Sequence, residues 1–534
     1  MKLKYFASLF SLLLLLPITS CREDVLDVDP VNSFLTDNYF TTDDQVFDAL
    51  VSAYDPMGWS IGFGDWISTV MYGEIRSDNA NAGGENSNTD QIPWQEVDDF
   101  TERESNSLAL GYYRRWYAGV LRANLVLERP EYSSALLTRY QAEAKFLRAY
   151  YHFQLFKFFG PIPVLDRVLT PDDVGETRNT MTEVFTAITQ DLAEAIEELP
   201  VVVGSAETGR ATRGAAQALL GKAYLYWADM DNDDAAKFDL AATNLQAVVN
   251  SGQYALVDDF NELWAFGSKN TVESIIEVQH TDKDDSNWGN TLSNEGNAMV
   301  QLCGIRSLCS DHPLYESGWG FLLPTASLYD HFKDDDTYRR DAATISVAEL
   351  EGDCPSAPAV VVSDNNEVDF EGYWQQKYAN YKGYLESQFP GSNQFLNKDP
   401  NTIVLRYADV LLMLAEALHR GGGSDAEAMS YIDEVRERAV GPDNNTFRNA
   451  QTFMTEEGVT LLELIWYERR AELAGEGHRW FDLVRSGRAT AEIFNGDPLR
   501  SGNFSPEQVW LPIGLEETNV APGLTTYPSA KLFQ

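Results

Sequence analysis

The apolar positions of this chain repeat at helical spacing in several long segments. Between residues 136 and 159 an apolar side chain recurs every three or four positions, and Gly160-Pro161 ends the pattern. Because one face of an α-helix repeats every 3.6 residues, this spacing predicts a helix of about six turns. The same reasoning predicts helices over the following segments: 185–199, 211–229, 241–250, 403–419 and 459–474. The chain is therefore expected to be mainly α, with short strands at 274–279 and 359–363.

The predicted helix at 211–229 is rich in small residues, including Gly214 and Gly221. Small side chains at helical spacing let a second helix approach closely. Leu220-Gly221-Lys222-Ala223-Tyr224 also matches the L-G-x-x-Y core of a tetratricopeptide helix pair, and a partner helix is expected at 241–250. These observations predict a scaffold of paired helices.

Two stretches differ from these helical segments in composition and periodicity. Residues 59–104 and 281–399 are rich in Gly, Asn, Asp, Trp and Tyr and show few helical periods. We expect them to be long irregular loops on a helical scaffold formed by about 31–58, 105–280 and 400–490. Binding residues tend to lie on such loops, so this loop-rich region is the predicted ligand-binding region.

The first thirty residues predict export and lipid attachment. A basic start, an apolar run too short to span a bilayer, and Ile18-Thr19-Ser20-Cys21 resemble the signal and lipobox of a bacterial lipoprotein. We therefore expect a signal peptide over 1–20, a lipidated tether over 21–30 with the lipid on Cys21, and one folded unit over 31–534. An ordinary secretory signal with an incidental cysteine is the alternative.

The acids that follow the cysteine suggest a final location. Arg22-Glu23-Asp24 resembles the acidic export signal by which lipoproteins of Bacteroidetes reach the cell exterior, although acids there can mean other sorting fates. The expected location is the outer membrane, lipid-anchored and facing outward.

Charge narrows the choice of partners. The formal net charge is −42, which repels nucleic acid and anionic membrane surfaces, so neither is an expected partner. The same charge slightly favours a neutral ligand over a polyanion, although a local basic cluster would reverse that preference.

The cysteines and acidic clusters predict no catalytic metal. Cys303 and Cys309 are close enough in sequence to form a disulfide in an oxidising compartment, which leaves Cys354 over. No Cys/His spacing suggests zinc. Asp229 begins a D-x-D-x-D run, but Gly and Glu are missing at the positions that a calcium loop needs, so an acidic turn is expected there. A structural calcium elsewhere in the loops stays open, and no cofactor is expected.

Several motifs, in order along the chain, resemble those of the SusD/RagB family. The motifs are Ala144-Lys145-Phe146-Leu147-Arg148-Ala149-Tyr150-Tyr151, Phe159-Gly160-Pro161-Ile162-Pro163, Gly209-Arg210-Ala211-Thr212-Arg213-Gly214, Leu405-Arg406-Tyr407-Ala408-Asp409-Val410, Glu468-Arg469-Arg470-Ala471-Glu472-Leu473 and His478-Arg479-Trp480-Phe481-Asp482-Leu483-Val484-Arg485. Residues 40–54 are similar to the family's opening helix, and Trp510-Leu511-Pro512-Ile513 is similar to its final strand.

The resemblance implies a fold and a role. The fold would contain about four tetratricopeptide-like helix pairs with variable loops on one side. The role would be to bind an oligosaccharide, or in some relatives a peptide, and deliver it to a SusC-like TonB-dependent outer-membrane barrel.

The acids near the C-terminus are predicted to be structural. Glu468, Glu472 and Asp482 lie among several arginines, and neighbouring arginines lower a carboxyl pKa, whereas a general acid needs a raised one. No motif of a serine hydrolase, zinc protease or nucleotide-binding enzyme occurs. The protein is thus expected not to be an enzyme, although a glycosidase with two carboxylates cannot be recognised from sequence.

Aromatic side chains in the loops are the predicted binding residues. A sugar ring has an apolar face and a hydroxyl rim, which suits an aromatic ring beside polar side chains. The residues expected to contribute are Trp66, Asp78, Asn81, Trp94, Trp288, Asn290, Tyr315, Trp319, Tyr373 and Trp374. For any one of these rings, packing is the more frequent role, and the helical Trp116, Trp227, Trp466 and Trp480 are assigned to packing.

Four functions are compatible with these patterns. A non-catalytic surface binder of oligosaccharides or polysaccharides is preferred because of the tryptophan-rich loops. The alternatives are a peptide binder, a surface glycoside hydrolase, and a structural subunit of the barrel with no ligand of its own.

Overall fold

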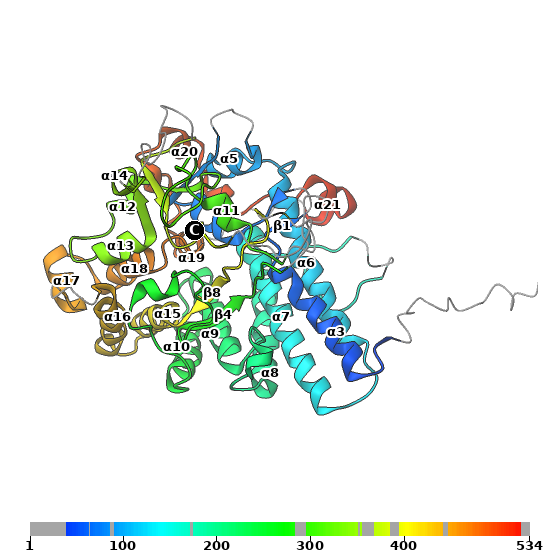
Figure 1. Ribbon diagram of the computed structural model, residues 1–534. Helices are drawn as coiled ribbons and strands as arrows, with labels where there is room; N and C mark the ends of the chain where they lie inside the picture. Colours follow the sequence, from blue (N-terminus) through cyan, green and yellow to red (C-terminus); the bar gives the residue numbers. More distant parts are fainter. Residues whose placement is uncertain are drawn as a thin grey trace, which may run out of the picture.

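A computed structural model describes residues 39–524 except for ten short gaps, and every structural statement below concerns these residues (Figure 1). The gaps are 63–64, 86–89, 171–172, 174, 284–294, 351–352, 355–367, 385–392, 394 and 442–446. The predicted strand at 359–363, and the signal, lipobox and tether, lie outside the described residues.

Long helices form one layer of the molecule, which runs across the lower half of Figure 1. They are α3 (Asp43–Tyr54), α6 (Ser107–Glu128), α7 (Ala135–Phe159), α8 (Met181–Glu198), α9 (Arg213–Met230), α10 (Ala235–Asn250), α15 (Tyr407–Gly421), α16 (Asp425–Ala439), α17 (Ala450–Glu457) and α18 (Leu461–Glu472). Consecutive helices pack on one another from α6 to α10, then α10 packs on α15 and α15 on α16. The predicted mainly helical scaffold is confirmed.

Local sequence explains where these helices begin and end. Ser134 begins α7, because its side chain accepts a hydrogen bond from the backbone N–H of Leu137. Thr180 and Glu183 form a reciprocal capping box at the start of α8. Gly160 ends α7 with φ of 67°, a conformation that favours glycine.

Small residues bring α9 and α10 together as predicted. A Cβ on Gly221 would lie 2.5 Å from Cγ of Leu245, which is closer than two carbon atoms can approach. The glycine therefore lets Leu245 of α10 pack directly against the α9 backbone, which is the close contact that a tetratricopeptide-like pair requires.

Short elements and loops form a second layer, in the upper half of Figure 1. Its helices are α4 (Thr69–Ile75), α5 (Ile92–Asp98), α11 (Met299–Cys303), α12 (Ala326–Tyr329), α13 (Thr337–Ala343), α14 (Val347–Leu350), α19 (Arg479–Arg485), α20 (Pro498–Asn503) and α21 (Leu515–Val520). The segment 281–399, expected to be mostly loop, thus contains several short helices and strands.

The described strands form four two-stranded antiparallel sheets. The pairs are β1 (Ile61–Gly62) with β2 (Asp65–Trp66), β3 (Ala80–Gly83) with β5 (Phe321–Pro324), β4 (Ser274–Val278) with β8 (Thr402–Arg406), and β6 (Thr344–Ser346) with β7 (Tyr373–Gln375). The β3–β5 pair joins the two loop-rich stretches, and β4–β8 lies between the two layers (Figure 1). The prediction of a strand at 274–279 is confirmed.

The structure moves the start of one predicted helix and does not contain one predicted strand among the described residues. The helix expected from residue 403 begins only at Tyr407, because Thr402–Arg406 is rich in β-branched and apolar residues and pairs with β4. The segment Trp510–Ile513 is not a strand. Its Leu511 N–H donates to the carbonyl of Phe158 at 2.8 Å, at the end of α7, so it packs as irregular chain.

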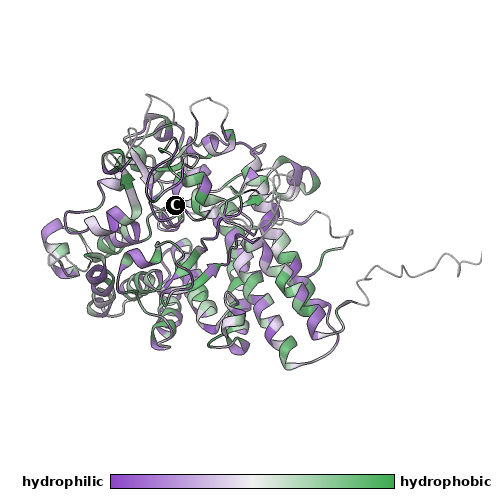
Figure 2. Ribbon diagram, viewed as in Figure 1, coloured by the Kyte–Doolittle hydropathy of each residue, from purple (hydrophilic) through white to green (hydrophobic). Residues whose placement is uncertain are grey.

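The main core runs through both layers. One cluster of buried apolar side chains extends from Phe40 to Leu524. Green and purple stretches alternate along the ribbons in Figure 2, as expected for helices with one buried and one solvent-exposed face. None of the described helices is both long and apolar enough to cross a bilayer.

Buried arginine–carboxylate pairs connect the helical layer to the second layer. Glu472 of α18 accepts hydrogen bonds from Arg406 and Arg438 and pairs with Arg339, and all four residues are buried. Asp482 likewise pairs with Arg469 and Arg485. The predicted pairing of these acids with arginines is confirmed.

Buried His152 of α7 should make stability fall as pH is lowered. Its Nε2 accepts a hydrogen bond from the N–H of Leu165 at 3.2 Å, and burial, with a smaller effect of Arg148, lowers its pKa to about 3. The folded state thus keeps His152 neutral, whereas the unfolded chain binds a proton near pH 6.5. This contribution is complete above pH 6.5 and decreases as pH falls towards 3.

The expected loss from His152 is about 2 kcal/mol between pH 7 and pH 5, since each unit below 6.5 contributes about 1.4 kcal/mol. In His152→Gln, the free energy of unfolding should fall less over this range by about that amount. Urea denaturation at the two pH values measures it. An equal fall in wild type and variant would contradict the assignment.

Candidate functional site

Three aromatic rings from distant segments meet in the loop layer, and we call them the aromatic surface: Trp66, Trp319 and Phe395. The ring centroids of Trp66 and Trp319 are 5.5 Å apart with planes at 74°, and those of Trp319 and Phe395 are 5.9 Å apart at 54°. Trp66 is buried, Trp319 is half-buried, and Phe395 is 36% exposed. The group therefore has a buried base and an accessible rim.

The Trp66 ring is held by a short hairpin fixed to α6. Trp66 pairs with Ile61 across β1 and β2, and its N–H donates to the carboxylate of Asp65 at 2.8 Å. Asp65 also accepts a hydrogen bond from the hydroxyl of Ser107, in the first turn of α6. The hairpin is thus attached to a rigid helix, which fixes the position of the ring.

The Trp319 backbone lies against α11. Its N–H donates to the carbonyl of Gln301 at 3.0 Å, and its carbonyl accepts from Nε of Arg306 at 2.8 Å. This approach requires two glycines, because a Cβ on Gly318 would lie 2.3 Å from Cα of Gly304. Trp319 is therefore placed by backbone contacts rather than by a mobile loop.

A second aromatic group adjoins the segment that carries Trp319. Tyr315 and Tyr381 have ring centroids 5.1 Å apart, and the exposed Phe266 lies 4.8 Å from Tyr384. The segments 315–319 and 378–381 run side by side, since Glu316 donates to the carbonyl of Asn380 at 2.8 Å. Aromatic side chains thus occur along both segments.

Two buried polar side chains, Asn380 and Lys398, lie in or near these segments. Asn380 donates to the side chain of Gln301 and to the carbonyl of Ser317, each at 3.2 Å. Lys398 is fully buried, and its ammonium has no hydrogen-bond partner. Burial lowers its pKa to about 8, although the nearby Glu316 acts in the opposite direction.

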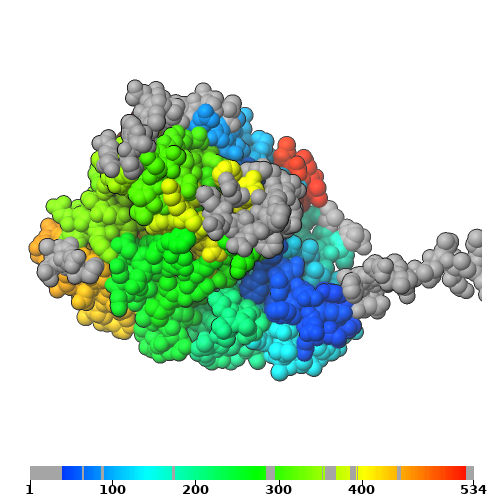
Figure 3. Space-filling model, viewed as in Figure 1, coloured from blue at the N-terminus to red at the C-terminus, as the bar shows by residue number. Residues whose placement is uncertain are grey.

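The arrangement suits a ligand with apolar faces and a polar rim. Tryptophan rings bury a large apolar area and keep a polar edge, which is how aromatic side chains bind amphipathic groups. In Figure 3, residues near 400, coloured yellow, reach the molecular surface beside the green middle part of the chain. The aromatic surface therefore has the chemistry expected for the stacking of a sugar ring.

Two predicted platforms are not exposed in this structure. Trp94 of α5 is completely buried in the main core. Trp374 of β7 is 1% exposed and packs on Phe370 with ring centroids 4.5 Å apart. Neither ring presents a face to solvent, because each one packs within a cluster of buried apolar side chains. Trp94 lies in the main cluster and Trp374 in the smaller one.

The predicted polar residues also have partners within the protein. Asp78 pairs with Arg479 and Arg470, which lower its pKa against the opposing effect of burial. Asn81 donates to the carbonyl of Asp369 at 2.7 Å and accepts from Arg500. In this structure both are buried and hold the β3 region in place.

The remaining predicted binding residues have different environments, and two of them are not described by the structure. Tyr373 is partly exposed and stacks on Tyr329 with ring centroids 4.3 Å apart, while Tyr315 is buried beside Gln376. Trp288 and Asn290 lie outside the described residues. Of the predicted aromatic residues, the structure brings Trp66 and Trp319 together.

Phe395, Phe266, Tyr381 and Tyr384 were not predicted. The signal for most of them was the aromatic run Tyr378 to Phe395, whose spacing resembles neither a helix nor a strand. The sequence prediction started from the loop tryptophans and the tyrosines near two of them, so it did not include these four rings.

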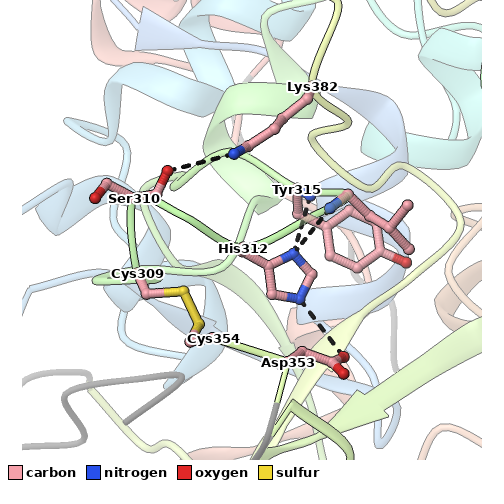
Figure 4. The surroundings of a disulfide bond; sticks show 8 residues. Cys309, Ser310, His312, Tyr315, Asp353, Cys354 and Lys382 are labelled. Atoms are coloured by element: carbon pink, nitrogen blue, oxygen red, sulfur yellow. Dashed lines mark hydrogen bonds and ion pairs between the residues drawn. A yellow bond between two sulfur atoms is a disulfide. The ribbon is translucent and has the colours of Figure 1, made fainter. Parts of the chain in front are cut away.

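The predicted Cys303–Cys309 disulfide was wrong. Cys309 is bonded to Cys354, with 6.3 Å between the two Cα atoms, and Cys303 is a buried thiol. Cys303 is the last residue of α11 and faces the main core, whereas Cys309 and Cys354 pack in a second, smaller cluster. Figure 4 shows His312 beside this bond, directed towards Asp353.

Peptide mapping without reduction should find one disulfide-linked peptide that contains Cys309 and Cys354. Cys303 should react with an alkylating reagent only after denaturation, because its side chain is 1% exposed and burial raises its pKa. A linked peptide that contains Cys303 would contradict this pairing.

The described residues offer no clear metal site. The one group of three close donor side chains among them is Cys309, Asp311 and Cys354, and its cysteines are already bonded to each other. Asp229 lies in the last turn of α9, where its buried side chain pairs with Arg485 at 2.7 Å and with Arg420.

Comparison with known proteins gives a consistent result. A family profile described as "SusD family" matches residues 345–529, and another described as "Starch-binding associating with outer membrane" matches residues 26–225. SusD-like protein P38 of Formosa agariphila is 26% identical over 508 residues, which are 91% of this chain and 92% of that protein.

Solved structures are similar over nearly the whole chain. A laminarin-binding SusD-like protein is 32% identical with a TM-score of 0.76, and the match covers 92% of this chain and 100% of that one. Surface glycan-binding protein A from Bacteroides thetaiotaomicron, in complex with laminarihexaose, is 26% identical with a TM-score of 0.79 over 92% of this chain and 100% of that one.

Proposed function

This chain belongs to the SusD family, and we propose that it is a non-catalytic cell-surface protein that captures an oligosaccharide or polysaccharide on its aromatic surface. The observation that carries this proposal is the contact of Trp66, Trp319 and Phe395, whose rings come from three distant segments. Its support from relatives is that similar solved proteins are named for binding laminarin and laminarihexaose. Laminarin, a neutral glucan, is therefore the first ligand to test.

The state of three carboxylates supports capture rather than hydrolysis. Glu472 and Asp482 are buried, and their arginine partners lower their pKa values against the effect of burial, which is opposite to what a general acid needs. Asp98 has a pKa raised to about 7 by burial, but it is 2% exposed and accepts a hydrogen bond from the N–H of Ala82, so substrate does not reach it in this structure.

The wider role is delivery to a transporter. We propose that lipid on Cys21 holds the protein at the outer membrane, facing outward, and that it passes its ligand to a SusC-like TonB-dependent barrel. The support is the sequence Ile18-Thr19-Ser20-Cys21 and a family profile whose description mentions association with the outer membrane.

Calorimetric titration of a soluble protein beginning at residue 22 tests the proposed ligand class. The panel contains laminarihexaose, a polyuronate, and a mixture of short peptides. We expect saturable binding to the neutral oligosaccharide with a dissociation constant between about 1 μM and 1 mM, without release of reducing ends. Binding to peptides alone would favour the peptide-binding alternative, and new reducing ends would favour the hydrolase.

A further inference from the structure

A cavity of about 80 Å³ with both apolar and charged lining residues lies between the helical layer and the β4–β8 pair, and we call it the inner cavity. Side chains from α6, α7 and α9 line it, together with Ser60 and His478. Its volume is enough for several water molecules. The inner cavity does not include the aromatic surface, and the proposed glycan binding does not use it.

Two cations that line this cavity have no carboxylate partner. Arg115 of α6 donates all three of its hydrogen bonds to backbone carbonyls, those of Pro56, Ile67 and Met57, at 2.6–2.7 Å. The Lys157 ammonium of α7 lies 4.3 Å from the centre of the Phe481 ring. No described carboxylate oxygen forms an ion pair with either residue.

The other charged groups of the cavity are already paired. Lys222 donates to Asp409 at 2.9 Å and lies 3.3 Å from Nδ1 of His478. Glu476 is paired with Arg406 and Lys377. The inner cavity therefore has an excess of positive charge inside a protein whose net charge is −42.

This excess is costly without a counter-ion. A buried charge without a partner is strongly unfavourable, so it either loses its proton or binds an opposite charge. Arginine does not lose its proton near neutral pH. Burial and the nearby Lys222 lower the pKa of Lys157, although Asp409 and Asp482, which are paired with other cations, act in the opposite direction.

Two neutral groups in the cavity also lack partners. The hydroxyl of Ser60 and the amide oxygen of Gln154 have no hydrogen-bond partner, although these residues are only 7% and 3% exposed. Both line the cavity. A hydrated anion would satisfy them, since the anion accepts a hydrogen bond from Ser60 and its water donates to Gln154.

We propose that the inner cavity binds one small inorganic monoanion, of the chloride and bromide class, beside Lys157. The ion supplies the negative charge that this part of the core lacks. It stabilises the contact between the helical layer and β4–β8 and takes no part in glycan capture.

Bromide is the probe, because its anomalous X-ray scattering identifies it directly. Crystals of the soluble protein grown in sodium bromide should show one anomalous peak inside the inner cavity, in contact with Nζ of Lys157. Peaks only on the outer surface, or none, would mean that water alone fills the cavity and would overturn the proposal.

A solution measurement tests the same site. The thermal midpoint of the wild type, relative to that of Lys157→Gln, should rise with bromide concentration and then saturate, at constant ionic strength set with gluconate. Comparison of the two proteins cancels the general effect of bromide on protein stability. Parallel bromide responses in both would overturn the proposal.

Lys145→Gln is the matched control, since Lys145 lies on the same helix and pairs with Glu194 at the surface. It removes the same charge from α7 and should keep the full bromide response. If Lys157→Gln does not fold, the wild-type crystal experiment decides alone. A bound bromide without glycan binding, or the reverse, separates this proposal from the proposed function.

Discussion

Replacing Glu472 with glutamine should lower the free energy of unfolding by about 3–5 kcal/mol, the usual cost of removing one partner from a buried ion pair. Glu472 is fully buried and contacts Arg406, Arg438 and Arg339, which come from β8, α16 and α13. Glutamine keeps the size of the side chain but removes the charge. Three buried guanidinium groups then lose a shared counter-ion.

The lowered pKa of Glu472 also indicates that its negative charge stabilises the folded state. Burial alone raises this pKa, but the combined effect of the three arginines is larger. The pKa of Glu472 therefore lies well below its ordinary value. The carboxylate therefore contributes stability above about pH 4.5 that is lost as pH falls towards its folded pKa. The variant should differ from wild type most at pH 7 and least in acid.

Urea denaturation at pH 7 measures this effect, and Glu516→Gln is the matched control. Glu516 also pairs with an arginine, Arg114, but its side chain is 66% exposed, so its loss should cost less than about 1 kcal/mol. A Glu472→Gln protein within 1 kcal/mol of wild type would show that the buried network is not a main source of stability.

Replacing Trp319 with alanine should weaken oligosaccharide binding at least about 30-fold, equivalent to about 2 kcal/mol. Trp319 is the ring that contacts both Trp66 and Phe395, and its backbone is fixed by Gln301 and Arg306. Its removal takes away the centre of the aromatic surface. The loss should appear in affinity and not in the fold, because the ring is only half-buried.

Calorimetric titration with laminarihexaose compares this variant with Trp466→Ala. Trp466 is also a partly buried tryptophan, but it lies on α18, where Arg488 covers its ring at 3.8 Å. The control should bind like wild type. Equal affinity of Trp319→Ala and wild type, with both proteins folded by circular dichroism, would remove Trp319 from the binding surface.

Sequence patterns predicted the helices well, because those signals are local. The apolar spacing of α7 and its end at Gly160 are properties of one continuous segment. The first residues of the predicted helix at 403 instead became β8, because β4 pairs with them from more than a hundred residues away. No local pattern contains that partner.

The candidate site was predicted only in part for the same reason. Trp94 and Trp319 both lie in polar, aromatic-rich segments, yet one is completely buried and the other is partly exposed. The difference depends on which other segments cover each ring. Likewise, Cys309 is near Cys303 in sequence, but the fold brings it to Cys354.

The most direct test of glycan capture is a crystal structure of the protein with laminarihexaose. The account predicts a pyranose ring stacked on Trp319 at about 4 Å, within reach of Phe395. A sugar bound elsewhere, with the rings of Trp66, Trp319 and Phe395 free of ligand, would contradict it.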